Sequence, residues 1–401
     1  MSPMEGSIES VTTKLEELMV ADFKGREKER LQLLNSARKM ISRVETLEER
    51  FHNISFLEPI VFATLKISLD LGLWKGWVAA GGGEKSLEEL AKLTEKECDL
   101  NLLGRSLRLL GAAHIIEETG EDRYKLTQFS QALGDDSIRV SGAMLARPYH
   151  WEVCSTNLPS FLAKTSYREP RDPRVSAYSD GNPEGLAFFE RCMANPEYQE
   201  GFSSSMTEWS KYKTPWPQYY DTETLIQGAD LFSGAPLVVD LGGHHGIDLF
   251  RFLDKHPDVP AGSLVLQDLD DVIAGANITT DKIKPMVHSL FEPQPVHGNR
   301  AYFFHCVFHD WPDQVAVQIL KNIKPAMKKG YSKILISDIV IPRTGATIYQ
   351  TGMDMNMLGL FSACERTEAA WTKLIEDAGL KLVKIWIDSR DFEGIIEAEL
   401  P

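Results

Sequence analysis

Cysteine is scarce in this chain and shows no pairing pattern. Five cysteines are spread over 401 residues, and no two of them form a CxxC pair. Disulfide frameworks use even sets of closely spaced cysteines, and zinc ribbons use CxxC pairs. We therefore predict reduced thiols and no metal site, with the cysteines at Cys98, Cys154, Cys192, Cys306 and Cys364.

Long apolar runs and an excess of basic charge are lacking as well. The most apolar stretch, 56–74, is interrupted by Glu58, Lys66 and Asp70, which makes it too polar to span a bilayer. The N-terminus has no apolar segment of the kind found in secretory signals. With 43 Lys and Arg against 58 Asp and Glu, the net charge of −15 argues against nucleic acid as a partner. We expect a soluble cytoplasmic protein that binds neither membrane nor nucleic acid.

The chain opens with highly charged helical segments. Apolar residues at three- and four-residue spacing predict helices at about 8–20 and 25–48. These helices are too short to form a core of their own. We interpret residues 1–50 as a helical arm that either joins two copies of the chain or folds over its own subunit.

Residues 51–135 are expected to form a small domain. An apolar helix at 57–73 precedes Ser86, which has a Glu three residues later, the signature of a capping box. A second helix is predicted at 100–110, followed by two β-prone runs around a turn at 119–122. Helix, helix and hairpin is the order of a winged helix. Because the second helix carries only two Arg, the pattern favours a dimerisation domain over a DNA reader.

The rest of the chain has two parts. Residues 136–232 are helical in pattern and rich in aromatics, and we expect them to connect the domains and contribute to a substrate pocket. From 233 to 401, apolar runs alternate with helical segments, which predicts a Rossmann-like α/β domain with helices on both faces of a parallel sheet. Helices are predicted at 247–253, 313–327 and 367–378, and strands at 236–241, 263–268, 300–305 and 333–338.

A glycine-rich loop follows the first of these strands. Gly242 and Gly246 allow a tight turn and a close approach of the backbone to a ligand. Asp268 ends the next strand, where an acid can bind both hydroxyls of a ribose. No Gly-Lys-Ser/Thr follows, and Asp240 is a poor neighbour for a phosphate but a good one for a cation. The pattern therefore points to S-adenosylmethionine.

Five motifs follow one another along the C-terminal part of the chain. They are Asp240-Leu-Gly-Gly-His-His-Gly246, Leu266-Gln-Asp-Leu269, Phe308-His-Asp-Trp-Pro-Asp313, Ile336-Ser-Asp-Ile-Val-Ile-Pro342 and Phe361-Ser-Ala-Cys-Glu-Arg-Thr-Glu368. With these motifs the chain resembles the caffeic-acid-type O-methyltransferases, in particular their fungal secondary-metabolite branch, which also includes S-adenosylmethionine-binding pericyclases. The resemblance covers residues 50–388 and implies a Rossmann-like catalytic domain after a winged-helix dimerisation domain.

The resemblance implies a catalytic group. His309 matches the general base, since a neutral imidazole accepts a proton near ambient pH. Asp338 and Glu365 match the two flanking acids, and Asp310 either assists them or caps the next turn. S-adenosylhomocysteine would be the product of methyl transfer. The expected cofactor contacts are Asp240, Gly242, Gly243, His244, Gly246, Asp268, Leu269, Ser289, Leu290, Phe291 and His305.

Three cofactor positions depart from the family pattern. His244 replaces the third glycine of the loop, and the adjacent His245 points in a different direction, so the two do not form a metal pair. Ser289 stands where the family usually has Asp, and His305 stands where relatives often carry Lys or Arg. We expect a reduced cofactor affinity or an altered cofactor placement.

These departures leave the reaction open. The retained His309, Asp338 and Glu365 favour methyl transfer to a hydroxyl of a natural product. The altered loop favours a pericyclase that binds S-adenosylmethionine without consuming it, and a third alternative is an inactive binding protein. Methionine suits an adaptable apolar pocket for a polyketide or aromatic substrate. The candidate pocket residues are His150, Met206, Trp209, Met353, Asn356, Met357 and Phe361.

Overall fold

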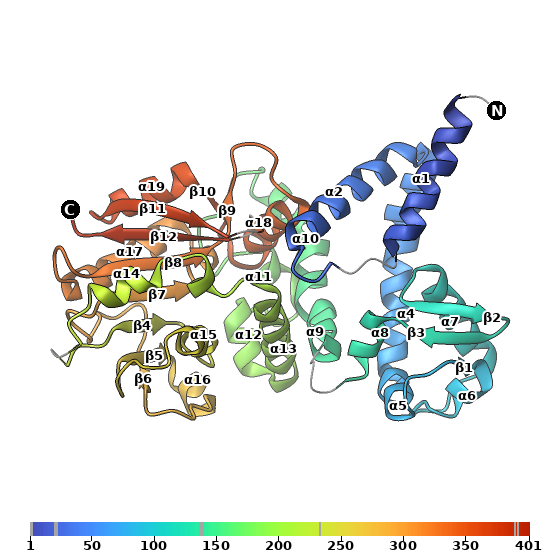
Figure 1. Cartoon of the computed structure of the whole chain (residues 1–401), viewed down its shortest axis with the longest axis horizontal. Helices are drawn as coiled ribbons and strands as arrows, with labels where there is room; N and C mark the ends of the chain where they lie inside the picture. The colour runs from blue at the N-terminus through green and yellow to red at the C-terminus, as the bar shows by residue number, and fades with distance from the viewer. Residues whose placement is uncertain (1–2, 20–22, 136–139, 232–233, 389, 391–392) are drawn as a thin grey trace. The chain divides into compact units, whose positions relative to one another are not determined.

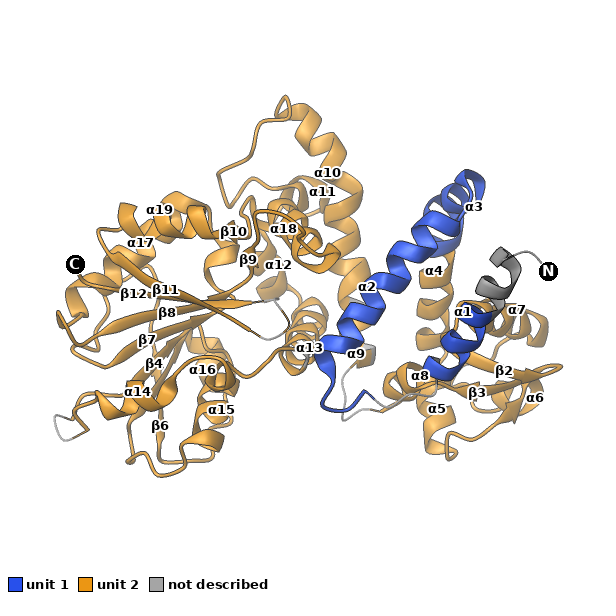
Figure 2. Cartoon of the chain, turned by 45° about the horizontal axis from the view of Figure 1, so that its top comes forward, with its two compact units in different colours: residues 1–59 blue, residues 60–401 orange. Residues whose placement is uncertain are grey.

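The computed structural model separates the chain into two compact units, residues 1–59 and 60–401 (Figure 2). No helix among the described residues combines the length and the apolarity needed to cross a bilayer. The described residues are 3–19, 23–135, 140–231, 234–388, 390 and 393–401.

The first unit consists of helices, as the spacing of its apolar residues predicted. Thr46 and Glu49 form a reciprocal capping box that starts the third helix. Within the described part of this unit, the second and third helices bury no residue, and apolar side chains such as Val44 and Phe56 are more than half exposed. The elements are α1 (Pro3–Met19), α2 (Glu27–Val44), α3 (Leu47–His52), η1 (Asn53–Leu57) and the start of α4 (Glu58–Asp70).

The N-terminal part of the second unit contains the predicted helices and hairpin. The capping box at Ser86 is confirmed, because its hydroxyl accepts from Glu89 N while the Glu89 side chain accepts from Ser86 N. Trp74 and Trp77 stack at the centre of its core. The winged-helix assignment and the dimerisation role stay predictions. The elements are α5 (Leu73–Ala79), α6 (Leu87–Ala91), α7 (Leu100–Ala112), α8 (Gln128–Leu133) and a sheet of order β1 (Lys85–Ser86), β3 (Arg123–Leu126), β2 (Ile116–Gly120).

A helical segment follows, and it packs against a helix from the C-terminal part of the chain. A Cβ built on Gly359 of α18 (Ile348–Phe361) would lie 2.1 Å from Cys154 Sγ, so the two helices can approach only because this residue is glycine. The predicted borders at 135/136 and 232/233 fall on residues outside the described ranges, and the domain division stays a prediction. The segment contains α9 (Val140–Ala146), η2 (Arg147–Trp151), α10 (Glu152–Lys164), α11 (Ala177–Gly181), α12 (Phe188–Ala194), α13 (Pro196–Tyr212), η3 (Trp216–Gln218) and α14 (Thr222–Gln227).

A seven-stranded sheet carries the C-terminal part of the chain (Figure 1). The order is β11-β12-β8-β7-β4-β5-β6. The strands β4 to β8 run parallel to one another, and β12 pairs antiparallel with both β8 and β11. The four predicted strands are present to within two residues as β4, β5, β7 and β8. Their bounds are β4 (Val238–Leu241), β5 (Leu264–Asp268), β6 (Ile283–Val287), β7 (Ala301–His305), β8 (Lys333–Asp338), β11 (Lys381–Ile387) and β12 (Gly394–Glu399).

Side chains that point alternately to the two faces of the sheet fill two hydrophobic cores, one on each face. Val239 and Leu241 of β4 join the core formed with α17 (Asp313–Ile323) and α19 (Glu368–Asp377). Val238 joins the other core, with Leu249 and Phe252 of α15 (Ile247–Lys255). Successive side chains of a strand point to opposite faces, so a strand buried on both faces must be apolar throughout. This is why the central strands were visible in the sequence.

The strand order creates a crevice at the carboxyl edge of the sheet. From β4 the chain runs outward through β5 and β6 and then returns to β7 on the other side of β4. In open α/β sheets, ligands bind at such a switch point, beyond the carboxyl ends of the strands. The carboxyl ends of β4, β5 and β7, with the segments that follow them, therefore line the expected binding edge. They contain the glycine loop, Asp268 at the end of β5 and His305 at the end of β7.

Candidate functional site

The loop after β4 is shaped for close approach by a ligand. Gly242 and Gly246 both have φ of +74°, and Gly246 starts α15. A Cβ on Gly243 would lie 2.4 Å from Asp240 Oδ2 and 2.6 Å from Leu266 Cδ1. Glycine is thus required at 243 by space and at the other two positions by backbone conformation.

Asp240 lies beneath this loop and is 1% exposed. Neither of its carboxylate oxygens has a hydrogen-bond partner within the described ranges. Burial, together with the nearby Asp248 carboxylate, raises the pKa of Asp240 well above its ordinary value. Buried polar groups are nearly always paired, so two orphaned oxygens at the ligand edge indicate a donor or cation supplied by a ligand. The amino group of S-adenosylmethionine fits this requirement.

The carboxylate of Asp268 is held in place by two backbone amides. Its Oδ2 accepts from His244 N at 2.9 Å, and its Oδ1 accepts from Leu269 N at 2.8 Å. His244 has a φ of +51°, in the left-handed region that usually favours glycine, and its backbone N–H still reaches the Asp268 carboxylate. Burial lowers the pKa of the His244 ring to about 4. The ring lies against His245, with centroids 3.9 Å apart.

Ser289, Leu290 and Phe291 follow β6 at the same edge. The Ser289 hydroxyl accepts from Phe291 N at 3.3 Å, so it caps its own turn. Leu290 packs against the core shared with α17, and Phe291 is about half exposed and meets Trp311 edge to face. The serine thus shapes this turn without adding a negative charge to it.

His309 forms a buried pair with Glu365. The histidine lies in the short helix η4 (Phe308–Asp310) after β7, and its side chain is 4% exposed. Its Nδ1 is 2.9 Å from Glu365 Oε1, and the backbone N–H of Glu365 donates to Asp354 Oδ1 at 2.9 Å. Burial and the nearby Asp354 raise the pKa of Glu365 well above its ordinary value. His309 Nδ1 and Glu365 Oε1 therefore lie within hydrogen-bond distance of each other in a buried environment.

Two further carboxyls flank the histidine. Asp310 Oδ1 lies 3.6 Å from His309 Nε2, and burial raises the pKa of Asp310 to about 7. Asp338, the last residue of β8, is 0% exposed, and its oxygens have no hydrogen-bond partner in the part of the chain that the structure describes. Burial raises its pKa to about 6. The structure thus brings all four predicted catalytic residues together.

Sequence reasoning missed Arg366, which holds the turn that carries His309. This guanidinium is nearly fully buried and donates to the carbonyls of Phe308 at 2.8 Å and Trp311 at 2.7 Å. Its Nε also donates to Asp313 at 2.9 Å. The residue stands next to Glu365 in the motif, so one short segment, extended by β10 (Arg366–Thr367), fixes both the ring and its backbone.

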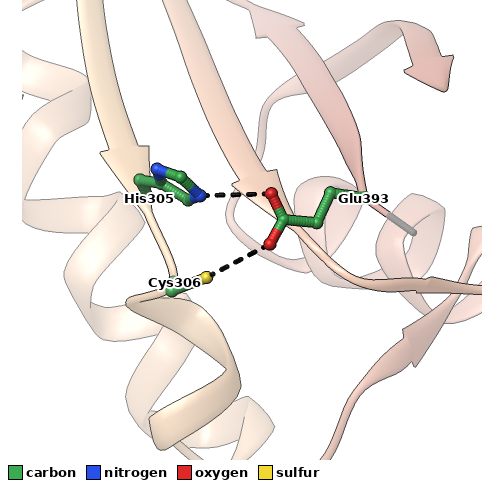
Figure 3. A group of neighbouring side chains, drawn as sticks. All are labelled: His305, Cys306 and Glu393. Atoms are coloured by element: carbon green, nitrogen blue, oxygen red, sulfur yellow. Dashed lines mark hydrogen bonds and ion pairs between the residues drawn. The ribbon is translucent and has the colours of Figure 1, made fainter. Parts of the chain in front are cut away.

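His305, predicted as a cofactor contact, sits in a cluster of charged side chains (Figure 3). Its Nδ1 is 2.6 Å from Asp248 Oδ2, and its Nε2 is 3.2 Å from Glu393 Oε2. Burial disfavours the imidazolium, but the carboxylate of Asp248 and that of Glu393 outweigh it, and the pKa of His305 lies well above its ordinary value. Asp248 and Glu393 were not predicted, since no local pattern marks them.

The predicted pocket residues lie on two helices and in one buried cluster. Trp209 of α13 stacks on His309, with ring centroids 6.0 Å apart and planes at 10°. His150 is 0% exposed, and its ring nitrogens contact the Tyr178 hydroxyl at 2.8 Å and the Tyr198 carbonyl at 3.2 Å. Its role as a substrate contact stays a prediction.

The remaining pocket candidates are all at least partly buried. Met206 belongs to α13, and Met353 and Asn356 belong to α18. The side chains of these three residues are partly exposed. Met357 and Phe361 of α18 are buried in an aromatic cluster with Phe188. The pocket assignment as a whole stays a prediction.

Comparison with known proteins identifies the family. Residues 175–381 match the O-methyltransferase domain family. The O-methyltransferase ATR12 of Stachybotrys chlorohalonatus is 46% identical over 397 residues, 99% of this chain and 100% of that protein. The solved structures of LepI with S-adenosylmethionine and of a pericyclic reaction enzyme superpose with TM-scores of 0.88 at 26% identity, covering 99% of this chain and 100% of those. OxaC with sinefungin and meleagrin gives a TM-score of 0.82 at 25% identity, covering 99% and 98%.

The match to ATR12 and the superpositions each cover 99% of this chain. The chain therefore belongs to the O-methyltransferase domain family, whose cofactor is S-adenosylmethionine, as the sequence predicted.

Proposed function

We propose that the protein is an O-methyltransferase of fungal natural-product biosynthesis, acting on a hydroxyl of a polyketide or aromatic molecule with His309 as the general base. The observation that carries this proposal is the buried pair of His309 and Glu365, 2.9 Å apart, at the same sheet edge as the glycine loop. The fungal relative named as an O-methyltransferase supports the reaction class.

The binding edge offers partners for the amino group, the ribose and the adenine of the cofactor. Asp240 would receive the amino group and Asp268 the ribose hydroxyls, and Gly243 leaves room for the Asp240 carboxylate beneath the loop. His244 contributes its backbone, and Leu269, Ser289, Leu290 and Phe291 would lie toward its adenine. When bound, S-adenosylmethionine supplies a methyl group on a positively charged sulfur.

His309 moves the proton in this proposal. As the substrate oxygen takes the methyl group, its proton passes to Nε2 of His309. The Nδ1–H then donates to Glu365, which stabilises the imidazolium, as the acid of a catalytic triad does. Positioning of the hydroxyl supplies much of the remaining rate enhancement, since the sulfonium is a good leaving group.

A pericyclase is the second candidate, because a pericyclic reaction enzyme superposes over 99% of this chain. It would bind the same cofactor without consuming it. A catalytically inactive binding protein is the third. The paired base and acid favour methyl transfer over both, since a histidine tied to a carboxylate suits removal of the hydroxyl proton.

The test is a mass-shift assay with a panel of hydroxylated aromatics and polyketides, run with His309→Ala and Gly243→Ala. Methyl transfer adds one CH2 to the substrate and yields S-adenosylhomocysteine. His309→Ala should lower kcat by about 10²- to 10⁴-fold with little change in the Kd of S-adenosylhomocysteine, whereas Gly243→Ala should weaken that binding. Isomerisation of a substrate without a mass change would indicate the pericyclase, and cofactor binding with no turnover the binding protein.

We also propose that the protein is a cytoplasmic homodimer joined through its N-terminal helices. The support is the large set of exposed apolar side chains in the first unit, including Met40, Ile41 and Leu57, which form a groove together with Val44 and Phe56. Helices with so little buried surface gain stability from packing against a partner.

A further inference from the structure

Three side chains beside the catalytic turn form a set of atoms that would suit a cation. The atoms are His305 Nε2, Cys306 Sγ and a carboxylate oxygen of Glu393, all within 4.8 Å of one another (Figure 3). Imidazole, thiolate and carboxylate are the ligands of zinc-type metal sites. A carboxylate that binds the other ring nitrogen orients such a histidine, and His305 Nδ1 lies 2.6 Å from Asp248 Oδ2 in this way.

The side chain of Lys213 occupies the space between these atoms. Its Nζ is 2.7 Å from Cys306 Sγ, 2.8 Å from Glu393 Oε1 and 3.2 Å from His305 Nε2. An ammonium has three N–H groups, and Cys306 Sγ and Glu393 Oε1 can each accept a hydrogen bond from this one. The Lys213 side chain is 5% exposed, so its charge is compensated by these neighbours and not by water.

The Lys213 ammonium also connects two segments that meet at His309, the proposed general base. Cys306 has a φ of +53° and begins the turn that carries His309 three residues later. Lys213 Nζ also lies 3.6 Å from the ring centroid of Trp209, and this indole stacks on His309. Loss of the ammonium would remove its contacts to Cys306 and Glu393, and would take the cation away from the indole of Trp209.

We propose that Lys213 is a positioning residue that acts as an internal cation. It fills the site formed by His305, Cys306 and Glu393 and thereby fixes the turn and the indole that orient His309. Arg366 donates hydrogen bonds to backbone carbonyls of this turn, and Lys213 contacts Cys306, the residue at which the turn begins. The expected effect of Lys213 on turnover rests on the proposed function, in which His309 is the general base. The expectation that the Lys213 ammonium occupies the cation site does not rest on it.

The test uses Co²⁺ as a spectroscopic probe of the full-length protein. Lys213→Met removes the ammonium and should open the site to one Co²⁺, seen as a thiolate-to-cobalt absorption band that is lost in Lys213→Met/Cys306→Ser. The wild type and Lys213→Arg should show no such band. Lys211→Met, an exposed lysine two residues away in α13, is the matched control and should also show none.

Kinetics supply the second measurement. Lys213→Met should lower kcat by about 10- to 100-fold with a KM near that of the wild type, because a small displacement of a catalytic group costs this much. Lys213→Arg should recover part of the loss. If Co²⁺ binds to Lys213→Met but kcat is unchanged, the positioning role is wrong although the cation site is real.

Other outcomes separate this proposal from the proposed function. A Lys213→Met chain that gives no cobalt band, or a wild type that gives one, overturns the internal-cation proposal, whatever His309→Ala does to turnover. A Lys213→Met chain that folds only with Co²⁺ present supports it. If that variant does not fold at all, Glu393→Gln replaces it: a lowered kcat at constant KM supports the proposal, and an unchanged kcat overturns it.

Discussion

The buried carboxyl of Asp338 should make the protein less stable as the pH rises. It is 0% exposed, and burial raises its pKa from the ordinary 3.8 to about 6. The unfolded chain therefore releases this proton at a lower pH than the folded protein does. Unfolding free energy is lost between about pH 4 and pH 6, and at about 1.4 kcal/mol per pH unit the loss is about 3 kcal/mol.

Asp338→Asn keeps the size of the side chain and removes its titration. Burial of the amide changes the unfolding free energy by an amount that does not depend on pH. The informative quantity is therefore how the difference in unfolding free energy between variant and wild type changes with pH. We expect the variant to gain about 3 kcal/mol relative to the wild type between pH 4 and pH 7. Urea denaturation at a series of pH values, followed by tryptophan fluorescence, measures this difference.

Asp281→Asn is the control, since Asp281 is exposed. Its difference from the wild type should show no comparable rise with pH. A difference for Asp338→Asn that stays level between pH 4 and pH 7, or that falls, would refute the reasoning. It would mean that a neighbour compensates the Asp338 charge in the folded protein.

Two predictions concern residues that hold the site and the assembly. Arg366→Met removes three charge-assisted hydrogen bonds, so the unfolding free energy should fall by about 3 kcal/mol or more, and kcat should fall with it. Urea denaturation and kinetics measure both effects against Arg343→Met, a control at an exposed arginine. An unchanged unfolding free energy and an unchanged kcat would contradict a role of Arg366 in holding the turn. Deletion of residues 1–50 should give a monomer in sedimentation velocity, because the exposed apolar helices are proposed to join two copies. A truncated chain that sediments as a dimer would show that the contact lies elsewhere.

The predicted parts of the site were those marked by local sequence patterns. Gly242, Gly246 and Asp268 follow apolar strands at positions where a ligand approaches a sheet edge. His309 and Glu365 were identified by resemblance to a family, and the structure pairs them at 2.9 Å. Asp338 ends a predicted strand, and its burial follows from that position.

The strands that were missed have weaker patterns. β6 contains Lys284 and Pro285 and lies at one edge of the sheet, where a strand needs no continuous apolar run and tolerates proline. β11 forms the other edge and contains Lys381 and Lys384, and the apolar pattern of β12 is interrupted by Glu397 and Glu399. These antiparallel strands bring Glu393 to the site, so the cluster around it could not be predicted either.

The sequence by itself determined the α/β class, the central strands, the glycine loop and the base with its acids, because each depends on residues that are close in the chain or on a motif. Only the tertiary structure decided the partners of these groups. Among the described residues, no group pairs with the oxygens of Asp240, and Lys213, Glu393 and Arg366 are buried charges whose partners lie on distant segments. Compensation of a buried charge depends on which segments the fold brings together, and no local pattern records that.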